Sequence, residues 1–396
     1  MACVGERGDA PRIVRVTEPA LPTAVVLDVR WTNGLAAIRS LGRAGVPVVA
    51  VAHARRALGF SSRYATPFVC PHPVLDEAEY VDALERLGDS LDRPAPLLPT
   101  HDEYLNPVAR NRERLGDRFR YPFPSWDVLA VIQSKRTQLE RARELGIPMP
   151  ETRYPDTVDE ALAAGKELGF PLVVKPSDPP MFRVRFHRQG FRCDSEPELV
   201  EAFHRAAPSG AVLQEFIVGG DEELFSLGAY VAEDGEPLGL FCGRKLRQTR
   251  KDIGSCRVGE AVWVDEVVQQ GLALLRGLEF HGIAQVEFKR DRSTGVYKLI
   301  EVNPRLWQWH GLAAACGVDF PRIAYWDLLG ARPPPVTTAG ASKRWAITLV
   351  RDDTPALVRP PYVEPMLARD DLRPALVHGA RLLRGPAGRV YRALAR

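Results

Sequence analysis

The clearest chemical pattern in this chain is a set of polar residues at alternate positions of a predicted hairpin. Glu301, Asn303 and Arg305 lie two residues apart, so they share one face if the strand persists to Arg305. A predicted turn separates this strand from the preceding one, which brings Glu287 close to Glu301. The pattern therefore gathers two carboxylates, one amide and one guanidinium.

These side-chain types favour a metal and phosphate site. Neighbouring carboxylates raise each other's pKa unless a cation lies between them. An all-oxygen ligand set suits Mg²⁺, which takes one or two carboxylates together with phosphate oxygens. Arg305 beside it offers a charge for a phosphate or a developing anion. From this segment alone, a solvated hairpin edge with alternating polar residues is the competing interpretation.

Two lysines lie where a phosphate could be bound. Lys175 closes the apolar strand predicted over 170–176, and Lys135 opens a predicted helix. Each lysine is either a phosphate ligand or an ordinary side chain that extends into solvent from the end of its element.

An acidic hinge follows the apolar strand predicted over 212–218. Glu215 is an unusual charge within that strand, which runs into a Gly-Gly pair and then into Glu222 and Glu223. Such a strand can present backbone groups to the edge of an adenine ring. The competing interpretation of the acidic pair is simple solvation of a loop.

The elements that would position these residues predict an α/β chain. A strand, a helix and a second strand follow one another near the start, which indicates a βαβ unit with a parallel pair. Thr157 is a predicted helix N-cap, with Glu160 completing a capping box. Ile300 and Val302 are predicted to point into a core. The predicted strands lie at 24–29, 46–52 and 96–99, the predicted helices at 35–44 and 131–145, and the predicted hairpins at 224–243 and 283–302.

Composition excludes several classes of protein. The chain has 396 residues, of which 45% are hydrophobic and 26% charged, and these fractions exclude a disordered or coiled-coil protein. Its net charge of +3 does not require a nucleic-acid partner. Its six cysteines form no CxxC pair, so structural zinc is not expected. The first residues lack an apolar signal core, and no apolar run approaches the ~20 residues that a membrane-spanning helix needs. We therefore expect a cytoplasmic protein.

Taken together, these features resemble the ATP-grasp superfamily, and within it the carboxylate–amine ligase branch of D-aspartate ligase-like proteins. The resemblance covers about residues 21–330 and rests on the order of the elements. That order is a helix-opening lysine (Lys135), a strand-end lysine (Lys175), a Glu-containing hinge (Glu215 to Glu223), a lone strand glutamate (Glu287) and Glu301-x-Asn303-x-Arg305. The segments 33–42 and 62–64 also look like this branch, less specifically.

The resemblance implies a fold and a division into domains. The expected fold is α/β and α+β multidomain: an N-terminal Rossmann-like βαβ domain followed by a two-lobed ATP-grasp fold, with the nucleotide between the lobes. The expected parts are a flexible tail (1–20), an N-terminal α/β domain (21–125), a first lobe with a lid (126–218), a C-terminal lobe with the Mg²⁺ site (219–332) and a C-terminal extension (333–396).

The resemblance also implies a role for each residue. Lys135 and Lys175 would contact the nucleotide phosphates, and Glu223, or else Glu222, would hold the ribose hydroxyls. Glu215 would accept the adenine amino group, and the main chain of Phe216, Ile217 and Val218 would bind the ring edge. Glu287, Glu301 and Asn303 would bind one or two Mg²⁺ ions, with Mn²⁺ as an alternative, and Arg305 would stabilise an acyl phosphate and its transition state.

The activity implied is an ATP-dependent ligase that joins a carboxylate, amino-acid-like in our interpretation, to an amine through an acyl phosphate. The expected partners are a small-molecule acid and amine, with no nucleic acid and no membrane span, and a homodimer is an open option. The acid or amine would lie between the N-terminal domain and the Mg²⁺ site. Candidate substrate residues are the helix start at Asn33 and Gly34, together with Thr100, Asp102, Arg244 and Lys245.

Two segments depart from the family pattern. The lid expected over 177–190 is rich in proline and arginine where family members carry glycine, so Arg183, Arg185 or Arg188 would replace backbone contacts to phosphate. Trp307 and Trp309 either line the substrate pocket or pack in the core.

Three other functions compete with the ligase. The unusual lid is compatible with a nucleotide-binding sensor or pseudoenzyme. A biotin-dependent carboxylase of the same fold is an alternative, although no biotinyl signal is present. The basic residues between His378 and Arg396 suggest binding to an anionic surface, against which a tail that packs on its own domain competes.

Overall fold

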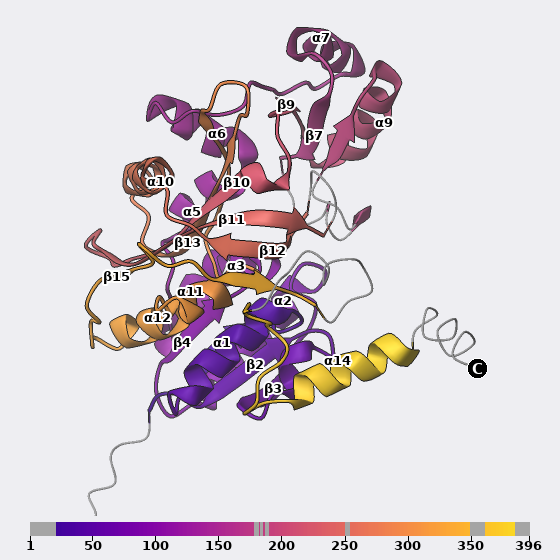
Figure 1. Cartoon of the computed structure of the whole chain (residues 1–396). Coiled ribbons are helices and arrows are strands. Elements are labelled where there is room, and N and C mark those ends of the chain that lie inside the picture. The colour runs from indigo at the N-terminus through magenta and orange to yellow at the C-terminus, as the bar shows by residue number, and fades with distance from the viewer. Residues whose placement is uncertain are drawn as a thin grey trace, which may run out of the picture.

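The computed structural model describes residues 21–177, 182, 185–186, 190–249, 254–348 and 361–384. The tail predicted over 1–20, Arg183 and Arg188 of the predicted lid and the basic residues beyond 384 lie outside the described residues. Three sheets organise the chain: an N-terminal sheet at the bottom of Figure 1, a central sheet above it and a small sheet at the top.

The N-terminal sheet has five parallel strands in the order β3-β2-β1-β4-β5. The strand order changes direction between β1 and β4, and in open α/β sheets ligands bind beside the carboxyl ends of the strands at such a point. We call this region, at the carboxyl ends of β1 and β4, the crevice. The strands are β1 (Ala24–Leu27), β2 (Val48–Ala52), β3 (Ala65–Val69), β4 (Ala95–Pro99) and β5 (Phe119–Arg120), and the helices are α1 (Thr32–Arg43), α2 (Glu77–Asp89), α3 (Asp102–Arg110) and α4 (Arg112–Leu115).

Helix α1 packs closely on β1 because Gly34 carries no side chain. A Cβ atom at this position would lie 2.6 Å from the Cα atom of Val29 and 2.7 Å from the carbonyl oxygen of Asp28. The helix ends before Gly45, whose φ of 79° favours glycine. The predicted βαβ unit is therefore confirmed, with its parallel pair between β1 and β2.

The central sheet is antiparallel along its main path, in the order β14-β13-β10-β11-β12-β16, and β15 pairs with β11 in parallel. Both predicted hairpins are present, as the β10–β11 and β13–β14 pairs. The strands are β10 (Leu224–Val231), β11 (Pro237–Gln248), β12 (Cys256–Ala261), β13 (Gly282–Arg290), β14 (Tyr297–Asn303), β15 (Val336–Thr337) and β16 (Arg344–Ala346), with helices α10 (Asp265–Gly277), α11 (Gly311–Ala315) and α12 (Phe320–Leu328).

The register of the β13–β14 hairpin places Glu287 directly opposite Glu301. A bulge follows this pair, since the next partners are Phe288 and Leu299. The extra residue is Ile300, which is only half-buried, whereas Leu299 lies in the core. The prediction that Ile300 points into the core is therefore wrong, because the bulge interrupts the strict alternation of the strand.

The small sheet has its own hydrophobic core, separate from the two cores that the larger sheets form. The side chain of Thr157 accepts a hydrogen bond from the backbone of Glu160, as the predicted N-cap requires. The strands follow the order β6-β9-β7-β8. They are β6 (Thr152–Arg153), β7 (Leu172–Pro176), β8 (Phe191–Cys193) and β9 (Ala211–Glu215), with helices α7 (Val158–Leu168) and α9 (Glu196–Ala206).

The helix predicted over 131–145 is in fact two helices. Helix α5 (Trp126–Gln133) ends before Ser134, whose extended backbone (φ −84°, ψ 119°) breaks the helix, and α6 (Lys135–Glu144) begins directly afterwards. The prediction that Lys135 opens a helix is confirmed. The strand predicted over 212–218 also ends earlier, at Glu215.

The C-terminal segment before α14 (Arg373–Arg384) is held against the N-terminal sheet by a buried arginine. Arg39 of α1 pairs with Asp371 at 2.9 Å and donates to the carbonyl oxygens of Pro365, Met366 and Asp371.

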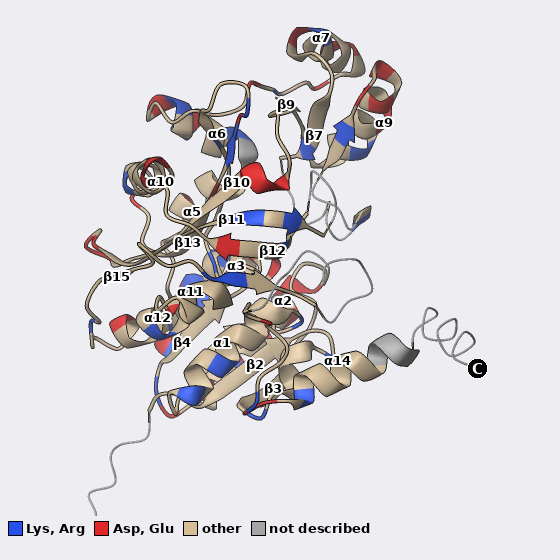
Figure 2. Cartoon of the chain, viewed as in Figure 1, with Lys and Arg blue, Asp and Glu red and all other residues tan. Residues whose placement is uncertain are grey.

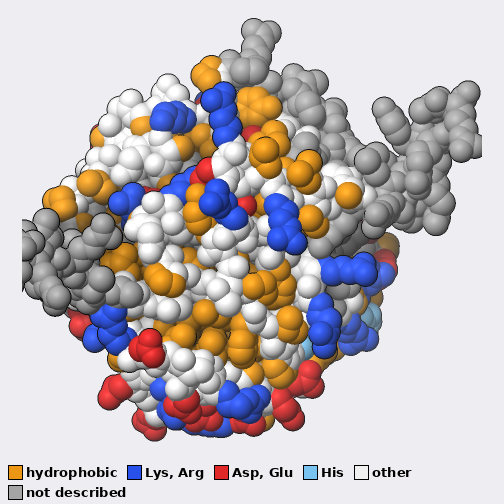
Figure 3. Space-filling model, turned by 90° about the horizontal axis from the view of Figure 1, so that it is seen from below, with side chains coloured by type: hydrophobic (Ala, Val, Ile, Leu, Met, Phe, Trp, Pro, Cys, Tyr) orange, Lys and Arg blue, Asp and Glu red, His pale blue; other side chains and the backbone are white. Residues whose placement is uncertain are grey.

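The face of the molecule that is drawn in Figure 3 mixes hydrophobic side chains with lysine and arginine. None of the described helices has the length and apolar character needed to cross a membrane.

We predict that Arg39→Met lowers the free energy of unfolding by about 3–5 kcal/mol, because it leaves the buried Asp371 carboxylate without its cation. Arg43→Met is the matched control on the same helix. Arg43 pairs with Asp370 but is 48% exposed, so its loss should cost less than about 1 kcal/mol. Chemical denaturation of both variants measures the two losses, and equal losses would contradict a special role for Arg39.

Candidate active site

The predicted metal ligands lie on one face of the β13–β14 hairpin. Glu287 and Glu301 are cross-strand partners, and Asn303 follows two residues after Glu301 on β14. The amide of Asn303 donates to Glu301 Oε1 at 3.1 Å and more weakly to Gln285 Oε1 at 3.4 Å. Glu287 and Asn303 are buried and Glu301 is half-buried, so two of the three side chains are shielded from bulk water.

Lys245 supplies a positive charge directly beside this set. Its Nζ lies 2.8 Å from Glu287 Oε2, and both side chains are buried. Burial by itself disfavours the ammonium, but the attraction of Glu287 outweighs it and raises the pKa of Lys245. The neighbouring Arg244 points elsewhere and pairs with Glu260 at 2.7 Å.

Arg305 joins the hairpin to the N-terminal sheet. Strand β14 ends at Asn303, but Arg305 still meets that residue by donating to Asn303 Oδ1 at 2.9 Å. The same guanidinium donates twice to Asp102, at 2.8 and 3.0 Å. Burial opposes the charge of Arg305, and the Asp102 carboxylate outweighs that effect and raises its pKa.

The donor set fits a hard cation. Carboxylate and amide oxygens are the ligands that Mg²⁺ prefers, and substrate phosphates commonly complete its shell. Across the described residues, no group of three or more His, Cys, Asp or Glu side chains could hold a metal ion. The predicted set has only two carboxylates and one amide, so additional oxygens would have to come from a bound phosphate or from water.

The predicted nucleotide residues lie where the small and central sheets meet. Glu215, at the end of β9, pairs with Lys298 of β14. The Phe216 ring lies under Lys289 Nζ, at 4.7 Å from the ring centroid, Ile217 is buried and Val218 is 53% exposed. The carbonyl of Val218 accepts from the backbone of Arg292 at 3.0 Å, which aligns the hinge with the β13–β14 turn.

Glu223 is held by two arginines. Arg290 Nε and Arg292 Nε lie 2.8 and 3.2 Å from its carboxylate. Burial of Glu223 favours the protonated form, but the two arginine hydrogen bonds outweigh burial and lower its pKa. Glu222 pairs with Arg292 as well.

The two lysines that are predicted to contact the nucleotide phosphates lie on different elements. Lys175 lies on β7, opposite Val212 of β9. Lys135 is the first residue of α6, and its side chain is outside the described part. In Figure 2, basic residues on β11 lie near acidic residues at the turn before β10 and on β12.

The predicted substrate residues at the helix start make internal hydrogen bonds. Asn33 Nδ2 donates to the carbonyl of Thr100 at 2.9 Å, and Thr100 Oγ1 donates to the carbonyl of Asp28 at 2.7 Å. His310 Nε2 lies 3.0 Å from the carbonyl oxygen of Asn33. These contacts tie β1, α1 and β4 together at the crevice.

The tryptophans after Arg305 pack in the core. Trp307 and Trp309 are each 1% exposed, and a Cβ atom on Gly228 would lie 2.2 Å from the Trp307 ring. Of the two interpretations of these residues, packing is therefore the one observed.

The crevice holds charged residues that sequence reasoning missed. Buried Asp28 accepts two short hydrogen bonds from Arg30, each 2.7 Å long, and Arg30 also reaches Glu103 at 3.1 Å. Burial favours protonation of Asp28, but Arg30 outweighs it and lowers the carboxyl pKa. Lys298 and Lys289 were missed as well. The spacing Asp28-x-Arg30 was the only local signal, and it is too common to identify a site.

A cavity of about 510 Å³ opens between the crevice and the small sheet. Its lining includes Glu103, Ser134 and Ser177. Ser134 immediately precedes Lys135, and Ser177 follows two residues after Lys175, so the cavity borders both predicted phosphate elements. Among the residues whose side chains the structure describes, none of the predicted site residues lines it.

The chain is similar in sequence to known enzymes, among them a ligase. No family model matches the chain. It is 25% identical over 283 residues to D-aspartate ligase from Enterococcus faecium, covering 68% of this chain and 67% of the relative. It is 28% identical over 321 residues to the carbamoyl phosphate synthase large chain from Thermus thermophilus, covering 74% of this chain but only 29% of that protein.

Solved structures share the fold at low sequence identity. L-amino acid ligase from Bacillus licheniformis superposes with a TM-score of 0.60 at 18% identity, covering 82% of this chain and 77% of that one. Biotin carboxylase from Campylobacter jejuni gives a TM-score of 0.62 at 16% identity, covering 78% and 72%. The sequence similarity to D-aspartate ligase confirms the resemblance that the motif order indicated, and the solved structures confirm the fold.

Proposed function

We propose an activity for this chain from the premise that it is an ATP-grasp protein related to the carboxylate–amine ligases. The proposed reaction is the ATP- and Mg²⁺-dependent joining of an amino-acid-like carboxylate to an amine through an acyl phosphate. The observation that carries the proposal is the opposition of Glu287 and Glu301, with Asn303 and Arg305 bonded beside them.

The proposed reaction has two steps. A substrate carboxylate oxygen attacks the γ-phosphorus of ATP, which forms an acyl phosphate and releases ADP. The amine then attacks the acyl carbon, inorganic phosphate leaves, and the amine loses a proton to give the amide. Positioning and charge neutralisation supply most of such catalysis.

The chain's own residues would act mainly through charge. Arg305, fixed by Asp102, would neutralise the acyl phosphate, and Lys175 would contact a nucleotide phosphate. Glu287, Glu301 and Asn303 would hold Mg²⁺, which when bound would draw charge from the phosphate oxygens. Lys245 would keep Glu287 ionised and fixed in place.

The nucleotide would lie between two lobes. We propose that 126–218 and 219–332 are these lobes and that the parallel sheet of 21–125 is a Rossmann-like domain. Glu215, the main chain of 216–218 and Glu223 are our proposed adenine and ribose contacts. Their gathering at the junction of the small and central sheets supports this assignment.

The acid or amine would lie in the crevice beside Arg305. The bidentate contact between Arg305 and Asp102 supports this location, because it brings the carboxyl end of β4 next to the hairpin. Asn33, Gly34 and Thr100 would then shape the wall of the crevice through their contacts with its backbone. Cytoplasmic location, homodimer formation and use of Mn²⁺ also stay predictions.

A biotin carboxylase-like reaction is the second candidate, favoured by the TM-score of 0.62 with biotin carboxylase. The two reactions differ in their acid: the carboxylase would use bicarbonate, and the ligase an organic carboxylate.

The proposed function is tested by phosphate release from Mg-ATP with amino acids and small dipeptides supplied in pairs, and with bicarbonate plus biotin. We expect release only when both an organic acid and an amine are present, with an amide product identified by mass. Release that needs bicarbonate and biotin instead would favour the second candidate. Nucleotide binding without release in any mixture would favour a sensor.

A further inference from the structure

A second cavity, of about 1030 Å³, lies away from the proposed active site. Its walls come from the N-terminal part of the chain around α4 and from the β10–β11 hairpin. His281, which lines it, lies just before β13, and Glu287 lies six residues further along that strand. At about 3.3 Å per residue, the two sites are roughly 20 Å apart.

Several charged and polar side chains in this cavity are satisfied by neighbours within the wall. Arg332 pairs with Asp234 at 2.6 Å, and the Tyr230 hydroxyl donates to Asp327 at 2.8 Å. These groups therefore have little charge left to offer to a ligand.

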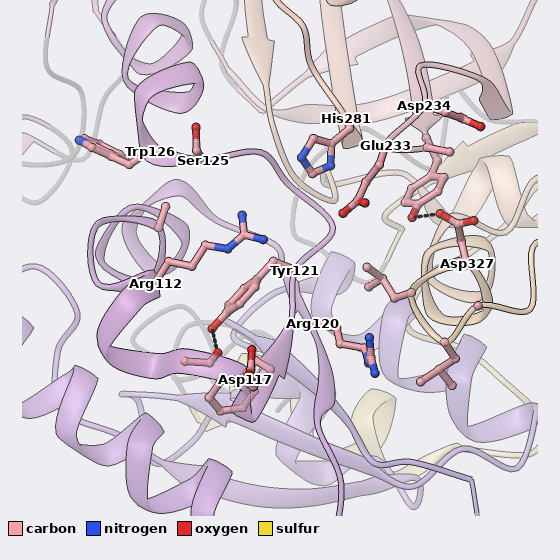
Figure 4. A pocket seen from close by; sticks show the side chains of 18 of the residues that line it. Arg112, Asp117, Arg120, Tyr121, Ser125, Trp126, Glu233, Asp234, His281 and Asp327 are labelled. Carbon is pink, nitrogen blue, oxygen red and sulfur yellow. Dashed lines mark hydrogen bonds between the residues drawn. The ribbon is translucent and has the colours of Figure 1, made fainter.

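Arg112 and Glu233 differ from these pairs. Neither side chain has an ion pair or hydrogen bond with any residue that the structure describes. The Arg112 guanidinium lies 4.7 Å from the centroid of the Tyr121 ring, which holds its position without neutralising its charge. In Figure 4, Arg112 and Glu233 extend toward the middle of the cavity from opposite sides.

His281 lies between these two charges. All three residues line the cavity, and Glu233 and Arg112 act on the His281 ring electrostatically in opposite directions. Burial is the main influence on His281 and lowers its pKa, so the ring is neutral near pH 7. It would present a hydrogen bond to a ligand rather than a third charge.

An unpaired cation facing an unpaired anion across a cavity matches a molecule that carries both charges. We propose that this cavity binds a small zwitterion of the amino-acid or dipeptide class, with its carboxylate on Arg112 and its ammonium on Glu233. A guanidinium binds a carboxylate with two parallel hydrogen bonds, and a carboxylate is a strong acceptor for an ammonium.

The other features of the cavity agree with this ligand. Its volume is at the upper end of the range for small-molecule sites, so a dipeptide fits as well as a free amino acid. Tyr121 and Trp126 offer aromatic surface for a side chain. The inference does not depend on the proposed ligase activity, because it uses neither the metal ligands nor the nucleotide residues.

Calorimetric titration of the full chain with L-alanyl-L-phenylalanine and with L-phenylalanine tests the proposal. N-acetyl-L-alanyl-L-phenylalanine lacks the ammonium, and L-alanyl-L-phenylalanine amide lacks the carboxylate. We expect at least one of the two zwitterions to bind. Each singly charged analogue should bind at least about tenfold more weakly than the zwitterion.

Two variants assign each charge to its residue. Arg112→Gln should remove the preference for the free carboxylate over the amide, and Glu233→Gln the preference for the free amine over its acetylated form. Glu233 is exposed, Arg112 is half-buried without a side-chain hydrogen bond, and both lie outside the proposed active site, so thermal unfolding and Mg-ATP binding should be unchanged.

Glu301→Gln is the control for location, since it alters the proposed active site and should leave zwitterion binding intact. The proposal is overturned if neither zwitterion binds, or if binding is unaffected by both cavity variants. Loss of zwitterion binding in Glu301→Gln alone would place the bound molecule in the active site and would also overturn it.

Discussion

Replacing Glu301 with glutamine is expected to lower acid- and amine-dependent ADP release by about 100-fold or more, with the fold intact. Glutamine keeps the size of the side chain and an oxygen that can accept from Asn303, so the hairpin should not rearrange. It removes one of the two charges that face each other across β13 and β14, and with it the attraction for a divalent ion.

The matched control for this prediction is Glu266→Gln on α10. Glu266 is exposed and accepts only a hydrogen bond from Gln270 among the described contacts. Its variant should turn over at the wild-type rate. Near-normal turnover of Glu301→Gln, with a wild-type thermal unfolding curve, would remove the metal role from this residue.

Replacing Arg305 with lysine is expected to lower kcat by about 100-fold while nucleotide affinity stays within a few-fold of wild type. Lysine keeps the positive charge but loses the planar fork that meets both oxygens of Asp102 and reaches Asn303. An amine at this position cannot hold the same geometry toward a developing anion, which is where such residues contribute most.

Single-turnover kinetics and nucleotide titrations separate these two effects. Arg344→Lys is the control, since Arg344 pairs with Glu260 at the exposed edge of the central sheet and is 47% exposed. A kcat equal to wild type in Arg305→Lys would mean that Arg305 only joins the two sheets. A parallel loss of nucleotide affinity would place it at the nucleotide instead of at the reacting carboxylate.

The hairpin that carries the candidate site was predictable because its signals are local. A turn between two alternating strands fixes which residues face each other, so the opposition of Glu287 and Glu301 followed from spacing alone. The bulge at Ile300 was not predictable in this way, since it depends on how β14 packs rather than on its own residues.

The contacts that join distant parts of the chain were beyond sequence reasoning. Asp102 and Arg305 are separated by 203 residues, and Arg39 and Asp371 by 332, and no local pattern pairs them. The break at Ser134 was missed for a different reason. The residues on both sides of it favour helix, and only the extended backbone of Ser134 separates α5 from α6.

The cavity lined by Arg112 and Glu233 was also beyond prediction from the sequence. Nothing in the sequence distinguishes either residue from an ordinary charged residue of a protein surface, and neither belongs to a motif. Only the folded arrangement, which brings α4 against the β10–β11 hairpin, makes them a pair of unneutralised opposite charges.

The most direct test of the metal site is ATP affinity measured with and without Mg²⁺, in wild type and in Glu287→Gln/Glu301→Gln. If these two glutamates grip the ion that neutralises the triphosphate, Mg²⁺ will tighten binding in wild type and have little effect in the double variant. The same Mg²⁺ enhancement in both proteins would contradict the assignment.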